Sequence, residues 1–396
     1  MRIKVGVIFG GVSVEHEVSV ISALQAFHSL DEKRYEGVPI YISKNGDWYT
    51  GADLVKIDEY KDLNKLLNKC EHVTLITDEN KRFLLNRVKP KLFDKKPVAE
   101  IDVAFPVIHG TNGEDGSLQG VLELAGVPYV GCDVLSSAVG MDKVIMKNVL
   151  RDSGVPIVGY IWFYKYEWNT SEAELTSKIE TEIGYPVIVK PANLGSSVGI
   201  SKAKNRSELD EAVVLAMSFA NKIIVEKVVQ ELTEINCSVL GDQETAEASI
   251  CEEVLGQDEI LSYADKYQSN SKGSKGMSGT NRKIPAEISD EQTNEVKSLA
   301  LKTFRVLGCS GVSRIDFLLD KKDGKVYVNE INTIPGSLSF YLWEPTGKSF
   351  TQLTTDLVQL AIKRQRERSE ITFSYDSNLF SLHSGSKGSK LGVKRS

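Results

Sequence analysis

Two short stretches of the chain, SRIDFLL at 313–319 and KVYVNEIN at 325–332, constrain its fold most strongly. Each alternates apolar and polar residues, and a Lys-Lys-Asp-Gly turn lies between them, which predicts an antiparallel β-hairpin. Because side chains on a strand point alternately to its two faces, Glu330 and Asn332 share a face. Arg314 and Asp316 also lie two residues apart on the first strand, so the pattern predicts that these charges share one surface.

Two carboxylates on one surface need a positive partner. At about 4 Å they repel each other by roughly 4 kcal/mol at an effective dielectric constant of 20. Carboxylate and amide oxygens are the ligands that Mg²⁺ and Mn²⁺ prefer, and these ions accompany nucleotide phosphates. The same pattern is equally typical of an exposed hairpin with solvated charges. The rest of the chain must therefore decide between a metal site and a plain hairpin.

Composition limits the class of protein. The chain has 396 residues with 41% hydrophobic and 26% charged, which is typical of a globular protein of two or three domains. Its net charge of −6 gives no basic field for nucleic acid. No apolar run is long enough for a membrane span. Five cysteines without a C-x-x-C pair indicate a reducing cytoplasm rather than disulfides or zinc.

The order of predicted elements indicates an α/β protein. Residues 1–41 read as strand, helix, strand, and the segment that ends at His109 returns as a buried strand, so we expect a parallel sheet. A more polar segment, 45–98, reads as an elaboration with a hairpin. The predicted units are 1–138, a substrate domain; 139–228, a central unit; 229–368, a catalytic unit; and 369–396, a disordered tail.

Several loops follow strands, where ligands of α/β proteins bind. The small-residue loop 195–199 comes after a strand that ends at Lys190, so it indicates phosphate contacts, although such a loop is often only a turn. Glu15 follows the first strand and indicates either an ammonium site or the start of a helix. The loop 109–116 either faces the same crevice or turns the chain. The long polar loop 263–283 is either a lid or a surface loop.

Five motifs in order resemble the D-alanine–D-alanine ligase family of ATP-grasp enzymes. They are FGGVSVEHEVS, IHGTNGEDGSLQG, GYPVIVKPANLGSSVGI, SRIDF and VNEINTIPG, and the resemblance covers roughly residues 1–362. It implies three α/β domains with ATP held between the central and C-terminal ones, and 263–283 as a lid. It also implies cytoplasmic synthesis of D-alanyl-D-alanine for peptidoglycan precursors, Mg²⁺ or Mn²⁺ as two ions, and a homodimer.

The resemblance also implies a role for each matching residue. The metal ligands would be Asp316, Glu330 and Asn332. The nucleotide contacts would be Lys143, Lys190, Ser197, Glu226, Lys227, Val229 through its backbone, Glu234 and Lys266. The catalytic groups would be Glu15 at the first substrate's ammonium, Arg314 and the Gly336 N–H at the oxyanion, and Ser196 with Tyr267 in a hydrogen-bonded arrangement that joins lid and substrate.

The chain departs from the family pattern at the second substrate. The family commonly has a small-His-Ser-Leu sequence after N-T-x-P-G, and its serine helps to bind the second carboxylate. Here Phe340 and Tyr341 stand near the positions of that His and Ser, so we expect a more aromatic pocket lined by Ser339, Tyr341 and Leu342. Alternatively, the two aromatic residues pack in the core and Ser339 binds the substrate.

Tyr267 favours an amino nucleophile, D-alanine or D-serine, because D-lactate-using members often carry a lid histidine. The sequence leaves three functions open. The first is ligation of D-alanine to D-alanine or to a close variant such as D-serine. The second is a nucleotide-binding regulator without turnover, and the third is an ATP-grasp ligase for another acid and amine.

Overall fold

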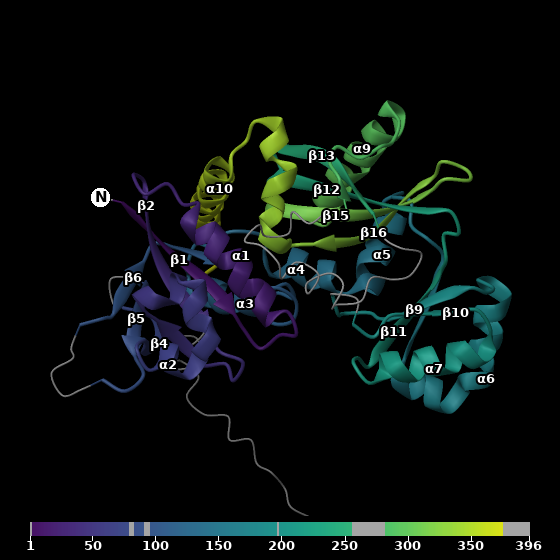
Figure 1. The fold of residues 1–396 in the computed structure, drawn as a ribbon, viewed down its shortest axis with the longest axis horizontal. Helices are drawn as coiled ribbons and strands as arrows, with labels where there is room; N and C mark the ends of the chain where they lie inside the picture. The colour runs from purple at the N-terminus through teal and green to yellow at the C-terminus, as the bar shows by residue number, and fades with distance from the viewer. Residues whose placement is uncertain (1, 79–82, 91–95, 196–197, 256–281, 375–396) are drawn as a thin grey trace, which may run out of the picture.

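The computed structural model describes residues 2–78, 83–90, 96–195, 198–255 and 282–374. In this part of the chain the strands form three sheets (Figure 1). The helices are α1 His16–His28, α2 Leu63–Leu67, α3 Ser117–Ala125, α4 Val134–Met141, α5 Lys143–Asp152, α6 Lys165–Glu182, α7 Arg206–Met217, α9 Asp290–Val306 and α10 Phe350–Ser369. The 3₁₀ helices are η1 Ala52–Val55, η2 Ile57–Asp62, η3 Gly336–Leu342 and η4 Glu344–Thr346.

The first sheet has seven strands in the order β6-β5-β4-β3-β2-β1-β7. They are β1 Ile3–Gly10, β2 Tyr35–Ile42, β3 Trp48–Thr50, β4 Glu71–Thr77, β5 Phe83–Arg87, β6 Ala99–Ile101 and β7 Val103–Pro106. Only β1, β2 and β7 pair in parallel, while β3 to β6 continue the sheet antiparallel. The predicted parallel strands are therefore confirmed at one edge of the sheet, in β2, β1 and β7, and the hairpin predicted in the polar segment 45–98 is confirmed as β4 and β5.

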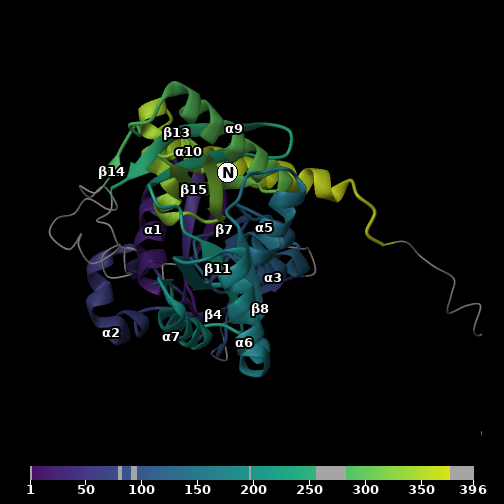
Figure 2. The same cartoon turned by 90° about the vertical axis from the view of Figure 1, so that its right-hand side faces the viewer.

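The second sheet has four antiparallel strands in the order β10-β9-β11-β8. They are β8 Tyr160–Tyr164, β9 Val187–Pro191, β10 Ser201–Ala203 and β11 Lys222–Lys227. Helices α6 and α7 pack against one face, where their apolar residues join those of the sheet in one core cluster (Figure 2). The hydrophobic run 223–229 is a strand only as far as Lys227. The opposite face of this sheet carries the polar residues Lys190 and Glu226.

The third sheet has five antiparallel strands in the order β14-β13-β12-β15-β16. They are β12 Leu232–Gly241, β13 Ala246–Val254, β14 Arg282–Lys283, β15 Gly311–Asp320 and β16 Val326–Asn332. The hairpin predicted from the alternating pattern is confirmed as β15 and β16. Helices α5 and α9 share a hydrophobic core with one face of this sheet. The predicted closing helix is confirmed as α10, which packs in the same core cluster as β1 and β7.

The boundaries predicted between the units, after residues 138, 228 and 368, stay predictions.

No helix in the described part of the chain is long and apolar enough to cross a membrane.

Candidate active site

The β15–β16 hairpin places Asp316 directly opposite Glu330, and Arg314 directly opposite Asn332. Residues in register on antiparallel strands have side chains on the same face. The Asn332 Nδ2 donates to Asp316 Oδ2 at 3.0 Å, so the four side chains do share one surface. The ladder then shifts register just beyond Asp316, which ends the regular pairing beside these residues.

Each of the two carboxylates has a cation beside it. Arg314 donates to Asp316 in bidentate fashion, with Nε–Oδ1 and Nη2–Oδ2 distances of 2.7 Å. Lys143 Nζ lies 3.2 Å from Glu330 Oε2. Burial opposes the charge on Arg314, but the neighbouring Asp316 carboxylate outweighs it and raises the pKa of the guanidinium. The expected repulsion between the carboxylates is therefore offset by side chains of the chain itself.

Lys143 is held by the start of α5. Asp142 caps this helix by accepting hydrogen bonds from the backbone N–H groups of Val144 and Ile145. The Lys143 ammonium also donates to the Leu194 carbonyl at 2.9 Å, at the edge of the small-residue loop. The capped helix thus fixes one lysine between the hairpin and the predicted phosphate loop.

A buried ion cluster joins the second sheet to α5. Lys190 Nζ lies 2.7 Å from Glu226 Oε2, and Lys147 Nζ lies 3.1 Å from Glu226 Oε1. Burial lowers the pKa of Lys147. Burial raises the pKa of Glu226, but the positive charges of Lys147 and Lys190 have the larger effect and lower it. Lys190 also donates to Asn329 on β16 at 3.3 Å. Two predicted nucleotide contacts, Lys190 and Glu226, thus lie together beside the hairpin.

A small hollow of about 40 Å³ is lined by residues that lie next to each of the three sheets, and several of them are predicted site residues. Its walls include Glu15 and Glu114 from the first unit, Lys143 from α5, and Glu330 and Asn332 from the hairpin. Residues predicted for the first substrate's ammonium and for the metal thus line one hollow.

Glu15 and Glu114 face the same hollow as two carboxylates of like charge. Burial and the nearby Glu15 raise the pKa of Glu114 to about 8. Glu114 nevertheless accepts hydrogen bonds from the N–H groups of Gly110 and Ile334, both at 2.8 Å. The loop 109–116 therefore does face the crevice, as one of its two interpretations had it. Glu15 precedes α1 as its N-cap residue, which confirms that it starts a helix, and its role as an ammonium site stays a prediction.

His109 fastens the first unit to the loop after the hairpin. Its Nδ1 lies 2.7 Å from the Ile334 carbonyl oxygen, and its Nε2 lies 2.8 Å from Ser22 Oγ. Burial lowers the pKa of His109 to about 4, so the imidazole is neutral near pH 7. The Ser337 N–H donates to the same Ser22 Oγ at 2.9 Å. These bonds set η3, which begins at Gly336, against α1.

The structure separates the residues predicted for the second substrate. Leu342 and Ser339 are fully buried, and Phe340 stacks on Phe350 with ring centroids 4.5 Å apart. The Tyr341 hydroxyl donates to Glu252 Oε2 at 3.2 Å. Phe340 thus packs against the core, as the alternative interpretation predicted. Tyr341 instead points its hydroxyl to Glu252. Ser339 Oγ has no hydrogen-bond partner among the described residues.

The remaining predicted residues lie at the link between the second and third sheets or outside the described residues. Lys227 ends β11, Val229 follows it, and Glu234 lies on β12 opposite Leu318, on the face that carries Asp316. The predicted lid 263–283 falls outside the described residues except for its last two, Arg282 and Lys283. The others outside them are Ser196, Ser197, Lys266, Tyr267 and tail residues 375–396.

The donor set suits a divalent cation. Asp316, Glu330 and Asn332 offer carboxylate and amide oxygens from one face of the hairpin, which are the ligands of Mg²⁺ and Mn²⁺. No group of three or more His, Cys, Asp or Glu side chains in the described part could hold a metal. The predicted set contains only two carboxylates, so nucleotide phosphates would complete the coordination. Arg314 must then share Asp316 with the ion.

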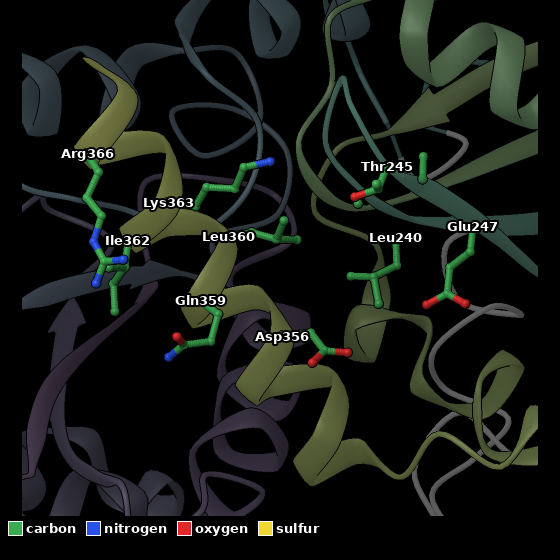
Figure 3. Close-up of a pocket in the computed structure, with 11 residues that line it drawn as sticks. Leu240, Thr245, Glu247, Asp356, Gln359, Leu360, Ile362, Lys363 and Arg366 are labelled. Carbon is green, nitrogen blue, oxygen red and sulfur yellow. The ribbon is translucent and has the colours of Figure 1, made fainter. Parts of the chain in front are cut away.

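A larger hollow, of about 530 Å³, lies between α10 and the β12–β13 turn. Figure 3 shows Asp356, Leu360 and Lys363 of α10 facing Leu240 and Thr245 across it. None of the predicted site residues lines it. It is therefore separate from the candidate active site.

Four polar residues at or beside the site escaped prediction as individual site residues. Lys147 is one helical turn after the predicted Lys143, so the shared helix face was an available signal. Glu114 stood in a loop that was noted but not assigned a role. Glu252 and Arg282 reach Tyr341 only through the pairing of β12 to β14, which nothing in the local sequence indicates.

Comparison with known families matches almost all of the chain. Residues 4–132 match the model described as D-ala D-ala ligase N-terminus, and residues 149–359 match D-ala D-ala ligase C-terminus. The chain belongs to the D-alanine–D-alanine ligase family. This membership makes it an ATP-dependent ligase and confirms the predicted family.

Individual relatives agree along their full length. The D-alanine–D-alanine ligase of Thermosipho melanesiensis is 40% identical over 383 residues, covering 97% of this chain and 99% of the relative. That of Caldicellulosiruptor bescii is 41% identical over 379 residues, with 94% and 99% covered.

Solved structures confirm the ATP-grasp fold. The D-alanine–D-alanine ligase of Coxiella burnetii has a TM-score of 0.77 at 28% identity, covering 97% of this chain and 99% of that one. The VanG D-Ala:D-Ser ligase of Enterococcus faecalis has a TM-score of 0.76 at 31% identity, covering 91% and 100%.

Proposed function

We propose that the chain joins two D-alanine molecules into D-alanyl-D-alanine, using ATP, through an acyl phosphate. The observation that carries the proposal is the hollow where Glu15, Lys143, Glu330 and Asn332 meet. It sets a carboxylate that suits an ammonium group beside oxygens that suit a divalent cation. The relatives named D-alanine–D-alanine ligase, at about 40% identity over nearly the whole chain, support the same reaction.

The first step activates the first substrate's carboxylate. Glu15 holds the ammonium of the first D-alanine. A carboxylate oxygen of this D-alanine then attacks the γ-phosphorus of ATP, and ADP leaves. Lys143 and Lys190 place positive charge at the phosphates, and Glu226 fixes Lys190 at 2.7 Å. Lys227, the Val229 backbone and Glu234 hold the adenosine between the second and third sheets. Asp316, Glu330 and Asn332 would hold the divalent ions, which would supply positive charge to offset that of the transferred phosphate.

The second step forms the peptide bond. The amine of the second D-alanine attacks the acyl carbon and gives a tetrahedral oxyanion, after which inorganic phosphate leaves and the amine loses a proton. Arg314 and the Gly336 N–H stabilise the oxyanion. Losing one such donor typically costs about 3–4 kcal/mol of transition-state stabilisation. Arg314 uses two of its donors on Asp316, and a guanidinium has five.

Water must be kept from the acyl phosphate, which hydrolyses readily. We propose that the lid 263–283 has this role and that Ser196 and Tyr267 join it to the substrate site, while Ser197 and Lys266 contact the nucleotide. These residues lie outside the described part of the chain, so the proposal for them rests on the family motifs alone.

Coupled measurement of ADP release tests the proposal. With ATP, Mg²⁺ and D-alanine, release should rise well above the rate with ATP alone, and D-alanyl-D-alanine should accumulate in equal amount. ATP binding without D-alanine-dependent release would instead favour a nucleotide-binding regulator.

A D-serine-using ligase is the second candidate. The VanG D-Ala:D-Ser ligase has a TM-score close to that of the D-alanine–D-alanine ligase of Coxiella burnetii, and Tyr341 brings a hydroxyl to the second-substrate region. Competition between D-alanine and D-serine for the second position, measured by product mass, separates the two candidates.

We further propose that the product feeds peptidoglycan precursor synthesis in the cytoplasm and that the chain forms a homodimer. Family membership supports these proposals. Light scattering of the purified protein tests the dimer, and a mass of 43.8 kDa in solution, that of a single chain, would contradict it.

A further inference from the structure

A row of polar side chains crosses the third sheet and extends beyond the predicted metal ligands. Glu252 on β13 is in register with Asn236 on β12, Asn236 with Asp316, and Asp316 with Glu330. Residues in register across neighbouring strands point to the same face. Glu252 therefore stands on the face of the candidate active site, two strands from Asp316, or about 10 Å at the usual strand spacing.

Arg282 on β14 joins this row at its outer end. It lies in register with Val254, which shares a face with Glu252. Arg282 Nη1 lies 2.8 Å from Glu252 Oε1, and the guanidinium carbon lies 4.8 Å from the centre of the Tyr341 ring. The Glu252 side chain is 1% exposed while that of Arg282 is 22% exposed. The Glu252 carboxylate is thus buried, and the Arg282 guanidinium is partly accessible.

The Tyr341 hydroxyl is already engaged in this cluster. It donates to Glu252 Oε2 at 3.2 Å, and Asn236 Nδ2 donates to the same oxygen at 3.4 Å. Burial raises the pKa of Tyr341, so its hydroxyl keeps its proton near pH 7. A tyrosine has one O–H donor, and Glu252 takes it. Tyr341 therefore does not replace a serine that would donate to a substrate carboxylate, although it stands near that position.

Arg282 reaches the region predicted for the second substrate. Its guanidinium carbon lies 4.8 Å from the centre of the Tyr341 ring, and Tyr341 lies in the chain between Ser339 and Leu342, the other residues predicted to line that pocket. Since Arg314 is committed to Asp316 and to the proposed oxyanion, a second anion nearby needs another cation.

We propose that Arg282 binds the carboxylate of the second D-amino acid, and that Glu252 and Tyr341 position its guanidinium. The proposal rests on the ligase function given above and adds a specificity-determining residue to it. A guanidinium binds a carboxylate through parallel N–H donors, which fixes the orientation of the attacking amine. The substrate class that fits is a small amino acid or hydroxy acid with a free carboxylate.

Steady-state kinetics of Arg282→Gln test the proposal. Initial rates over a wide range of D-alanine are fitted with separate constants for the two substrate sites. The KM for the second D-alanine should rise roughly tenfold or more, as expected for the loss of hydrogen bonds to a charged group. The KM for ATP and for the first D-alanine should stay within about twofold. Arg282→Lys should give an intermediate second-site KM because it keeps the charge.

Matched variants separate binding from packing. Arg2→Gln, an exposed arginine paired with Glu36 on the first sheet, should leave every KM unchanged. Tyr341→Phe should raise the second-site KM less than Arg282→Gln does, because the ring that stacks on Arg282 remains. A larger effect of Tyr341→Phe would overturn the proposal in favour of substrate binding by the hydroxyl.

Failure of this inference differs from failure of the proposed function. If the wild-type chain releases ADP with D-alanine and Arg282→Gln leaves the second-site KM unchanged, Arg282 has no such role. An equal rise in all three constants together with a lower melting temperature would also overturn it, because that pattern marks a structural residue. Absence of D-alanine-dependent ADP release from the wild type would instead overturn the ligase function itself.

Discussion

Glu226 is the residue on which the buried charges of the candidate site depend. It is 3% exposed and lies between Lys147 and Lys190, so it compensates two cations at once. Glu226→Gln leaves two buried ammonium groups without a counter-charge. We expect the free energy of unfolding in urea to fall by about 3–5 kcal/mol, the usual loss when one partner of a buried ion pair is removed.

Glu244→Gln is the control for this substitution. Glu244 is also paired with a lysine, Lys363, but is 73% exposed. Solvent screening makes such a pair weak, so the unfolding midpoint should hardly move. An equal loss of stability in the two variants would show that Glu226 is not an energetically special position.

Glu114 gives the molecule a pH dependence that can be isolated by substitution. Its pKa is about 8 when folded and near 4.5 in its ordinary state, so between these values the folded chain holds a proton that the unfolded chain has lost. Stability from this group is therefore present below pH 4.5 and is lost as the pH rises towards 8. The unfolding free energy of the wild type minus that of Glu114→Gln should fall, on the order of 2 kcal/mol, between pH 5 and 8. A difference that is flat or rises with pH would contradict this.

At the scale of elements, η3 stores backbone strain next to the site. Ser337, Leu338 and Ser339 all have positive φ values of 50° to 52°, a conformation that favours glycine. Ser339→Gly should raise the free energy of unfolding by about 1 kcal/mol, because it relieves one such position. Ser339→Ala keeps the strain, so it separates the backbone effect from loss of the buried hydroxyl.

The same two variants test the assignment of Ser339 to the second substrate. If its hydroxyl binds that substrate, both variants raise the second-site KM. If it is only buried, neither does, and the gain in stability comes without a kinetic change.

Sequence patterns predict elements well where the period is local. The alternation in 313–319 and 325–332 predicted β15 and β16 and the opposition of Asp316 and Glu330. The hairpin predicted in 45–98 is β4 and β5, but β3 and β6 were not predicted, because strands of three residues are too short to show a period of two. The site residues that local patterns indicated are those that follow strands, such as Glu15.

At the scale of the whole molecule, α10 ties the C-terminal part to the first unit. Arg364 donates to the carbonyl oxygens of Tyr129 and Gly131 at 2.6 Å, and its guanidinium carbon lies 4.3 Å from the centre of the Tyr129 ring. Arg364→Gln should lower the free energy of unfolding by about 2 kcal/mol, since hydrogen bonds from charged donors contribute about that much. Arg366→Gln, two residues on and exposed, should have little effect. Equal melting temperatures for the two variants would show that the contacts of Arg364 with Tyr129 and Gly131 do not stabilise the fold.

The contacts that close the site are the ones that the sequence could not predict. His109 meets the Ile334 carbonyl across 225 positions of the chain, and Glu252 meets Tyr341 across 89. Such contacts depend on sheet order and on the docking of η3 against α1, and neither leaves a local period. Family motifs named Glu15, Arg314 and Glu330 because these residues lie within motifs, but they did not indicate Glu252, and they included Arg282 only as one residue of the lid.

The central claim is that the β15–β16 hairpin holds the divalent ions that accompany the nucleotide. Calorimetric titration of Mn²⁺ into the chain with a non-hydrolysable ATP analogue tests it most directly, using the wild type, Glu330→Gln and the exposed control Glu344→Gln. We expect the Mn²⁺ dissociation constant to rise roughly tenfold or more in Glu330→Gln and to stay unchanged in Glu344→Gln. An identical isotherm for the wild type and Glu330→Gln would contradict the claim.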